Sequence, residues 1–316
     1  MDRDVLVTIG VITYNSSEFV VETLESIKAQ TYKNIELIIS DDASTDRTVE
    51  VCNAWVSKNE GNINAKVIST KNNTGTAGNC NRILNNCHGE WLKIIAGDDL
   101  LMPNAIEQYV NFVRSNDNIS HVVANIKCFD DNGDLDIDDD RDLTRYLCRE
   151  EASVEEQQSV ITKLFFGDGP SYFVRKSTLL DVGAYDERFA LQEDYPLFIR
   201  MIEAGHKLYM MDFVAVKYRV RNDSVSHTCE GNSLFPSNLV RVIRDYRFLY
   251  RKEHSTAFWK VMHYISLTLS SLIIWTGNNK ELWACRLSYS IYKILDPYVW
   301  FGRYMYFKMN RYNLSK

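Results

Sequence analysis

Three pairs of adjacent acidic residues stand where an apolar segment ends or where a helix is expected to begin. They are Asp41–Asp42, Asp98–Asp99 and Glu193–Asp194. Neighbouring carboxylates repel each other, and burial makes their ionised form more costly. A hard divalent cation, which prefers oxygen ligands, relieves that repulsion. These pairs are therefore the first candidates for metal binding, phosphate binding or proton transfer.

The segment Trp91–Ala96 is the strand around which we expect the chain to be organised. It is mostly apolar and has the right length for a strand buried on both faces. Gly97 ends it, and Pro103 stands where the first turn of the next helix would begin. In an open α/β sheet, ligands bind at the carboxyl ends of the strands. We interpret Asp98–Asp99 as a metal-bridged phosphate site, although a solvated turn capping the next helix would explain the same residues.

The first hundred residues alternate predicted strands with predicted helices. Between the strands, apolar residues recur at helical spacing, as they do from Phe19 to Ile27. This alternation predicts a parallel sheet with right-handed crossovers. The predicted strands are Val5–Ile12, Ile35–Ile39, Ala65–Ser69 and Trp91–Ala96. Two of them end in paired aspartates, which the topology would bring to the same edge.

Further elements are expected up to about Val220. The predicted strands are Ile119–Ile126, Ser171–Val174, Leu208–Met211 and Val214–Val220, and the predicted helices follow Pro103, cover Val154–Phe166 and Ser177–Asp181, and follow Asp194. The acidic stretch Asp130–Asp142 could suggest a metal site, but a run of like charges is more typical of a solvated loop.

Charge is distributed unevenly along the 316 residues. The segment from Arg241 to the end has 13 basic and 4 acidic residues, a net charge of +9, whereas the rest carries −15. An acidic body argues against a nucleic-acid groove. The basic, aromatic C-terminal part suggests contact with an anionic membrane surface.

The cysteines and the N-terminus indicate the compartment. The seven Cys form no C-x-x-C pair and no zinc-ligand spacing, which favours a reducing environment. No apolar run follows a basic one at the N-terminus, so no signal peptide is predicted. We therefore expect a cytoplasmic protein, with the inner face of the plasma membrane as a place of attachment.

The C-terminal part differs in character from the rest. Val261–Trp275 is largely apolar but shorter than the ~20 residues that span a bilayer. Tyr298–Lys308 mixes aromatic and basic residues, as interfacial segments do. A helical cap packed on the domain is the alternative. The sequence thus predicts two domains, residues 1–228 and a helical extension over residues 229–316.

The motifs taken in order resemble those of the family 2 glycosyltransferases. Val7–Asn15 looks like the opening strand with its T-Y-N end, and Asp41–Asp46 matches D-D-x-S-x-D. The remaining matches are Asn73, Gly75, Asn81 and Gly89–Glu90 before the central strand, Gly97–Asp99 at the D-x-D-like position, Glu193–Asp194 with Arg200 and Gly205, and Tyr218 with Asn222 and Ser224. The resemblance covers about Val5 to His227. This chain departs from it at Ile12, where many members have Pro, and at Cys80, where many have Arg and this chain has Arg82 instead.

The resemblance implies an α/β GT-A (nucleotide-diphospho-sugar transferase) fold, with a mostly parallel central sheet flanked by helices. It implies an inverting enzyme that moves a sugar from a nucleotide-diphosphate sugar, expected to be a UDP-sugar, to a saccharide or lipid-linked saccharide acceptor. Cell-surface polysaccharide synthesis is the expected setting.

The resemblance also implies a role for each motif. Asp42 and the strand end Thr13–Tyr14 would hold the uracil and ribose, and Asn81 would contribute to substrate binding. Asp99 would ligate Mg²⁺ or Mn²⁺ on the diphosphate, with Asp98 toward the ribose or the water shell of the metal. Asp194 would be the catalytic base, and Glu193 would bind substrate beside it.

Other interpretations of the same residues stay open. Asp46 is best explained as a helix N-cap, and Asp194 could also be only an N-cap before Pro196. His227 is more simply structural than catalytic. A receiver-like domain also gathers aspartates around Mg²⁺ but should be far shorter, and no G-x-G-x-x-G supports a Rossmann dehydrogenase. A catalytically inactive GT-A scaffold would be expected to lose Asp99 or Asp194.

Overall fold

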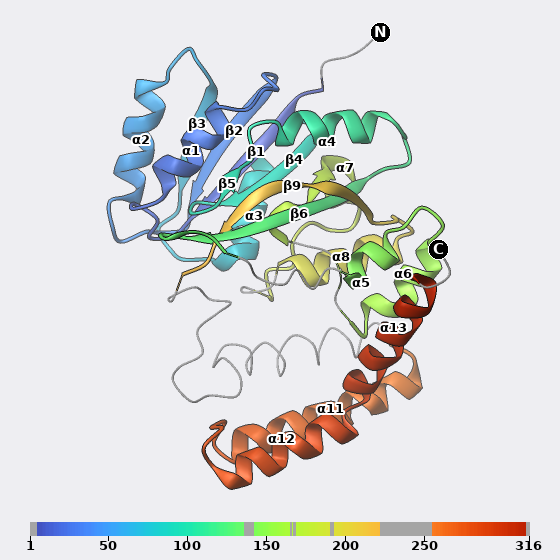
Figure 1. The fold of residues 1–316 in the computed structure, drawn as a ribbon. Coiled ribbons are helices and arrows are strands. Elements are labelled where there is room, and N and C mark those ends of the chain that lie inside the picture. Colours follow the sequence, from blue (N-terminus) through green and yellow to red (C-terminus); the bar gives the residue numbers. More distant parts are fainter. Residues whose placement is uncertain are drawn as a thin grey trace. The chain divides into compact units, whose positions relative to one another are not determined.

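The structure is a computed structural model that describes residues 5–135, 142–164, 166, 169–189, 193–221 and 255–313 (Figure 1). The chain divides into two compact units. The first unit holds the strands of the described residues, and the second holds α5 (Asp142–Leu147), the end of α6 (Val154–Ile161) and the C-terminal helices.

The N-terminal half of the first unit is the parallel sheet that the sequence predicts. Its strands lie in the order β3-β2-β1-β4, each parallel to its neighbour. They are β1 (Val7–Thr13), β2 (Ile35–Asp41), β3 (Asn64–Ser69) and β4 (Trp91–Ala96), and the connecting helices are α1 (Val20–Lys28), α2 (Thr48–Lys58) and α3 (Gly75–Asn86). The end of β1 is in register with the end of β2, because Thr13 pairs with Asp41. The two motifs that follow these strands therefore start side by side.

The other half of the sheet mixes strand directions. Strand β8 (Phe173–Arg175) lies between β4 and β6 (His121–Asp130) and is antiparallel to both. Strand β9 (Tyr209–Arg219) is parallel to β6 and antiparallel to the short β5 (Leu100–Leu101), and β7 (Gly133–Asp134) pairs with β6. The two strands predicted over 208–220 are thus one strand, whose register with β6 shifts twice beside Asn125.

Aromatic rings join the two halves of the sheet. Phe173 on β8 stacks on Trp91 of β4 at a centroid distance of 5.0 Å and on Tyr109 of α4 (Ala105–Arg114) at 4.9 Å. All three side chains are buried. Ring pairs of this kind add to the stabilisation that burial of their area gives. The helices of this half are α4 (Ala105–Arg114), α6 (Val154–Ile161), the 3₁₀ turn η1 (Gly169–Ser171), α7 (Lys176–Asp181) and α8 (Asp194–Glu203).

The second unit is helical, as the sequence predicts for the C-terminal part. It contains α5 (Asp142–Leu147), α11 (Ala257–Trp275), α12 (Trp283–Leu295) and α13 (Pro297–Asn313). The buried Asp296 accepts bonds from the backbone N–H groups of Tyr298 (2.8 Å) and Val299 (3.1 Å), so it caps the start of α13. The predicted boundary at residue 228 lies outside the described residues.

Helix α11 extends the apolar run seen in the sequence. It has 19 residues, and among the described residues it is the one helix long and apolar enough to cross a membrane by length and composition. Only 17% of its most apolar window is buried. Length and composition alone do not assign a membrane span, but the helix leaves apolar surface exposed.

Candidate active site

The loops that follow β1 and β2 are fastened to each other. The Asn15 side chain accepts a bond from the Thr45 N–H (2.8 Å), and the Asn15 N–H donates to the Ser44 hydroxyl (2.8 Å). Asn15 has a positive φ of 51°, which asparagine tolerates better than most residues. The T-Y-N and D-D-x-S-x-D motifs therefore form one structural unit at the carboxyl edge of the sheet.

Within this unit, Thr13 and Tyr14 play different parts. The Thr13 hydroxyl is buried and donates to the carboxylate of Asp41 (3.1 Å). The Tyr14 side chain is 52% exposed at the end of β1. Of these two residues predicted to bind the nucleotide, Tyr14 is therefore the exposed one, and its contact with a nucleotide stays a prediction.

Asp42 is enclosed by hydrogen-bond donors. It is buried, and its carboxylate accepts bonds from the N–H groups of Thr74 (2.9 Å) and Gly75 (2.8 Å) and from the Thr74 hydroxyl (2.6 Å). It also pairs with the Arg82 guanidinium at 3.1 Å. Asp42 thus ties the end of β2 to the start of α3. Its predicted contact with uracil stays a prediction.

Arg82 is a residue of this site that sequence reasoning did not assign. Its guanidinium donates to the Asn79 side chain (2.9 Å), the Ser40 hydroxyl (3.2 Å) and the Thr74 hydroxyl (2.9 Å), besides Asp42. The sequence signal was present, because Arg82 stands two positions after the place where relatives have Arg. On a helix this displacement changes the face on which the side chain lies, so the pattern alone could not give its partner.

The prediction of Asp46 as a helix N-cap is wrong by one residue, because the N-cap of α2 is Arg47 and Asp46 precedes it. Asp46 still bonds to the start of the helix. Its carboxylate accepts bonds from the N–H of Thr48 (2.9 Å) in the first turn of α2 and from the N–H of Ser17 (3.1 Å). Burial raises the pKa of Asp46, but these hydrogen bonds outweigh it and lower the pKa to about 2.

Asp98 and Asp99 lie where β4 comes close to the end of β1. The Gly97 N–H donates to the Ile12 carbonyl (2.9 Å), and a Cβ on Gly97 would lie 2.8 Å from the Thr13 methyl carbon. Gly97 is therefore needed for the close approach of the two strand ends. Asp98 is partly exposed and Asp99 is buried. Burial, together with the charge of Asp98, raises the pKa of Asp99 well above its usual range.

Arg219, at the end of β9, holds this pair in place. Its N–H donates to the Asp99 carboxylate (2.9 Å), and its Nε donates to the Asp98 carbonyl (3.0 Å). The guanidinium, itself buried, pairs with Glu22 (2.6 Å) and Asp131 (3.4 Å). Sequence reasoning missed Arg219, although it directly follows Tyr218 of the last motif. The bonding depends on the pairing of β5 with β9, which no local pattern shows.

The chemistry of this pair fits a divalent cation that is shared with a substrate. Carboxylate oxygens are ligands that Mg²⁺ and Mn²⁺ prefer, and Mg²⁺ is commonly held by one or two carboxylates together with substrate phosphates. Within the described part of the chain, no group of three or more His, Cys, Asp and Glu side chains could hold a metal ion. The site therefore suits a metal that arrives with a diphosphate better than a metal held by protein side chains alone.

Asn81 fastens the loop that leads toward Glu193. Its side-chain amide donates to the Tyr185 carbonyl (2.9 Å) and to the Glu187 carboxylate (2.8 Å). Its carbonyl oxygen accepts from the Tyr185 N–H (2.9 Å). These bonds give Asn81 a structural task, and its predicted contact with substrate stays a prediction.

Glu193 and Asp194 stand at the start of α8. The Asp194 carboxylate accepts a bond from the Tyr195 N–H (2.7 Å). Burial and the charge of Asp194 raise the pKa of Glu193 to about 8, and burial raises the pKa of Asp194. Burial and these two carboxylates also raise the pKa of Tyr172, whose buried hydroxyl has no hydrogen-bond partner in the described structure. Among the described residues, the pair therefore has raised pKa values and few hydrogen-bond donors that would lower them.

The family follows from comparison of the whole sequence. The sequence model for Glycosyl transferase family 2 matches residues 8–179, which is more than half of the chain. The chain belongs to glycosyl transferase family 2. The predicted recognition of this family is confirmed, and this glycosyltransferase is an enzyme of that class.

Curated relatives cover most of the chain. An uncharacterized glycosyltransferase of Methanocaldococcus jannaschii is 25% identical over 284 residues, which are 87% of this chain and 91% of the relative. A UDP-Glc:alpha-D-GlcNAc-diphosphoundecaprenol beta-1,3-glucosyltransferase of Escherichia coli, WfaP, is 27% identical over 245 residues, which are 75% of this chain and 86% of the relative.

Solved structures confirm the GT-A fold. Residues 1–349 of S. aureus TarS, in complex with UDP-GlcNAc, superpose with a TM-score of 0.60 at 18% identity, covering 84% of this chain and 72% of that one. The mannosyltransferase PcManGT of Pyrobaculum calidifontis, in complex with GDP-Man and Mn²⁺, gives a TM-score of 0.60 at 16% identity, covering 99% and 88%.

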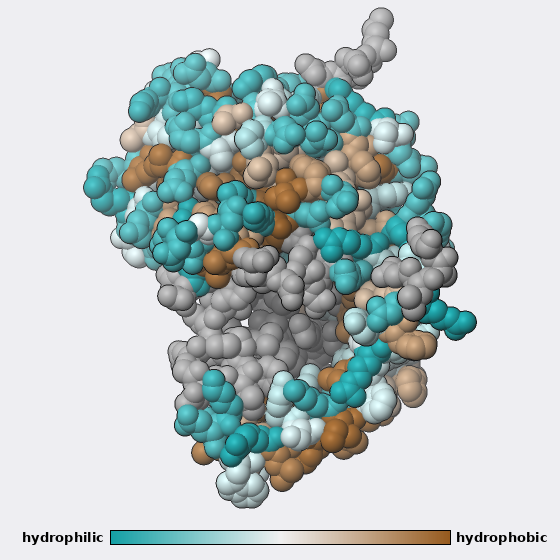
Figure 2. Space-filling model, in the orientation of Figure 1, coloured by the Kyte–Doolittle hydropathy of each residue, from teal (hydrophilic) through white to brown (hydrophobic). Residues whose placement is uncertain are grey.

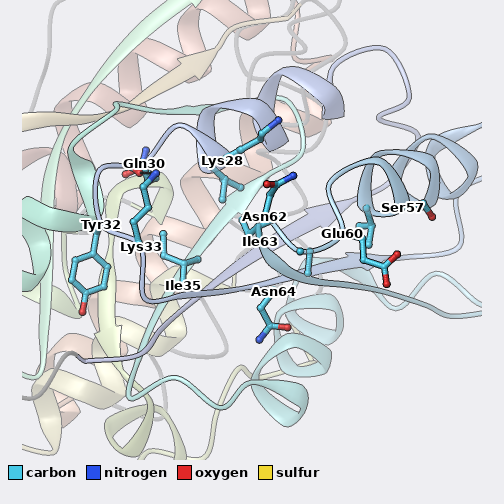
Figure 3. A pocket seen from close by; sticks show the side chains of 14 residues that line it. Lys28, Gln30, Tyr32, Lys33, Ile35, Ser57, Glu60, Asn62, Ile63 and Asn64 are labelled. Carbon is cyan, nitrogen blue, oxygen red and sulfur yellow. Dashed lines mark hydrogen bonds between the residues drawn. The ribbon is translucent and has the colours of Figure 1, made fainter.

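A pocket of about 690 Å³ lies elsewhere on the glycosyltransferase (Figure 3). It is lined by Lys28 at the end of α1, by side chains of the connection from α1 to β2, such as Lys33, and by side chains of the connection from α2 to β3, such as Glu60 and Asn62. These connections lead into the amino ends of β2 and β3. The paired aspartates follow the carboxyl ends of β2 and β4, so this pocket is separate from the candidate active site.

Proposed function

We propose that this glycosyltransferase moves a sugar from a UDP-sugar to a saccharide or lipid-linked saccharide with inversion at the anomeric carbon. One observation carries the proposal. Two carboxylate pairs belong to different elements, with Asp98–Asp99 at the end of β4 and Glu193–Asp194 at the start of α8. Two separate pairs can serve two substrates, with Asp98–Asp99 on the side of the nucleotide-sugar donor and Glu193–Asp194 on the side of the acceptor.

On the donor side, Asp99 would hold a divalent cation and Asp98 would bind the ribose or the water shell of the cation. When bound, Mg²⁺ or Mn²⁺ neutralises the charge that develops on the leaving diphosphate. Tyr14, exposed beside the Asp42 loop, would stack on the base. The complex of PcManGT with Mn²⁺ and that of TarS with UDP-GlcNAc support a nucleotide-sugar donor in this fold.

On the acceptor side, Asp194 would act as general base. The acceptor oxygen forms a bond to the anomeric carbon while the bond from that carbon to the diphosphate oxygen breaks. The acceptor proton passes to Asp194, and the diphosphate leaves with the bonding electrons. A raised pKa favours this role, because a base works best when its pKa lies near the working pH.

A panel of donors tests the donor class and the metal. Thermal stabilisation should be largest with a UDP-sugar plus Mg²⁺ or Mn²⁺, and EDTA should remove it together with transfer. The anomeric configuration of the product, read by NMR, should be opposite to that of the donor. Preference for GDP-Man, activity in metal-free buffer or retention of configuration would each contradict the corresponding part of the proposal.

The helical unit supports a second part of the proposal, which is peripheral attachment to the inner face of the plasma membrane. Large apolar side chains on α11, α12 and α13 are exposed, and Figure 2 shows hydrophobic residues along α11 and α12. The most exposed are Trp275 (83%), Trp283 (74%), Phe307 (68%), Phe258 (64%) and Tyr306 (62%). Basic residues on the same helices include Lys260, Lys293, Arg303, Lys308 and Arg311.

Such a surface would bring the enzyme to a lipid-linked acceptor of the kind named for WfaP. Anionic liposomes should sediment the protein at low salt, and added salt should weaken binding because charge contributes to it. Loss of binding in the double change Trp275→Ser and Trp283→Ser would assign the contact to these rings. If liposomes bind no protein at low salt, the helices serve as a structural cap instead.

A further inference from the structure

The backbone of Gly169, in the 3₁₀ turn η1, comes close to the Asp194 side chain. A Cβ placed on Gly169 would lie 2.7 Å from Asp194 Oδ2, 3.4 Å from its Cγ and 3.5 Å from its Cβ. Real Cβ atoms essentially never come within 3.0 Å of another heavy atom. The φ angle of Gly169 lies outside the left-handed region, so its own φ angle does not require glycine. The obstacle to a side chain here is the carboxylate of Asp194.

The turn that contains Gly169 is fixed from three directions. The Pro170 carbonyl accepts a bond from the buried Lys93 Nζ on β4 (2.6 Å). The Ser171 carbonyl accepts a bond from the Tyr109 hydroxyl, and the Ser171 hydroxyl accepts one from the Ala124 N–H on β6 (3.1 Å). A larger residue at position 169 therefore has little freedom to move the turn away.

The helix on the other side is fixed as well. Leu197, Phe198 and Ile199 of α8 are fully buried, which anchors the helix in the core. The Arg200 guanidinium donates to the Val182 carbonyl (2.6 Å) and to the Ala184 carbonyl (2.5 Å). With both backbones held, the part that gives way is the Asp194 carboxylate, which can rotate about its side-chain bonds.

We propose that Gly169 is a positioning residue for the reaction: its missing side chain leaves the space in which the Asp194 carboxylate meets the acceptor. This inference rests on the proposed function, in which Asp194 is the general base. It explains why position 169, which no sequence motif singled out, is occupied by glycine.

The test is Gly169→Ala, with transfer and donor binding measured separately. A displaced base should lower kcat by about 10–100-fold, since misplacement by about an ångström has effects of this size. Calorimetry should show donor affinity close to native. Gly302→Ala is the matched control, because a Cβ there meets nothing nearer than Leu164 at 4.0 Å, and it should keep native kcat.

A double-mutant cycle separates positioning from general damage. In the Asp194→Asn background, Gly169→Ala should cost little further activity, because no base remains to be displaced. Gly169→Ala should also lower Tm, because its Cβ crowds the Asp194 carboxylate. In the Asp194→Ala background that carboxylate is absent, so this loss of Tm should largely disappear. That stability readout holds even if Gly169→Ala alone folds poorly. The proposal is overturned if Gly169→Ala causes the same loss of activity in the native and Asp194→Asn backgrounds, and the same loss of Tm in the native and Asp194→Ala backgrounds.

A further control removes an alternative cause. The residue before a proline is disfavoured in helical conformation, so glycine could serve only to precede Pro170. If Pro170→Ala restores activity to Gly169→Ala, the positioning role is wrong. A native rate in Asp194→Asn would overturn the proposed base, whereas loss in Asp194→Asn with a native rate in Gly169→Ala overturns the role of Gly169 alone.

Discussion

The Asp41–Asp42 pair and the Glu193–Asp194 pair contain similar groups in opposite surroundings. The first pair accepts seven hydrogen bonds, from Thr13, Ser44, Thr74, Gly75 and Arg82. At the second, Asp194 accepts one from Tyr195 within the described part of the chain, and the pKa of both members is raised. Carboxylates supplied with donors hold loops together, whereas partly buried carboxylates with few donors retain affinity for a proton. Similar sequence patterns therefore stand in different surroundings, and we expect a structural role for the first pair and a chemical role for the second.

The largest effect should come from Asp194→Asn. Asp194 is the first residue of α8 and Glu193 is its N-cap, so the N-cap alternative for Asp194 is wrong. The amide keeps the shape and can still accept the bond from the Tyr195 N–H, but it cannot take a proton from the acceptor, a step typically worth ~10²–10⁴-fold in rate. Transfer should fall by that amount while UDP-sugar affinity and Tm stay close to native. Calorimetric titration of donor and a transfer assay decide it. A native transfer rate would leave Asp194 with a structural role only, as the acceptor of the Tyr195 N–H bond.

Asp99→Asn should act on the donor side instead. Loss of a carboxylate ligand should weaken metal-dependent UDP binding and transfer together, by tenfold or more, which corresponds to about 1.4 kcal/mol. The control is UDP binding in EDTA, where native and variant should agree. If the variant loses transfer but binds UDP and Mn²⁺ like the native protein, Asp99 is not a ligand of the metal.

Part of this fold and of the candidate site could be predicted from the sequence alone. Most of the strands, the parallel half of the sheet and the strand-end aspartates follow from local apolar patterns and chain order, whereas the two-residue strands β5 and β7 were not predicted. Arg219 could not be found that way, because it reaches Asp99 through a pairing between β5 and β9 that lie more than a hundred residues apart. Gly169 was missed for the same reason, since its constraint comes from α8.

Asp42→Asn should affect stability more than chemistry. The amide carries no charge to pair with Arg82, and in either orientation its NH2 group faces a donor, which is Arg82 on one side and the N–H groups of Thr74 and Gly75 on the other. Hydrogen bonds to charged groups contribute about 1.5–3 kcal/mol, so urea unfolding should show a loss of that order. Asp194→Asn is the matched change and should lose far less. Equal losses in the two variants would contradict the contrast between the pairs.

The smallest change per pH unit should come from Glu193→Gln, read as the slope of stability against pH. The pKa of Glu193 is about 8 in the folded protein, against 4.5 for the free side chain. Between these values the folded state binds more protons than the unfolded state, so stability should fall as pH rises, by at most about 1.4 kcal/mol per pH unit for one proton. Glu193→Gln has no proton to lose and should flatten this dependence between pH 5 and 8.

Chemical unfolding at several pH values measures the slope of stability against pH for the native protein and for Glu193→Gln. A native-like slope in Glu193→Gln would show that the proton is held elsewhere, and Asp194 would be the next residue to examine.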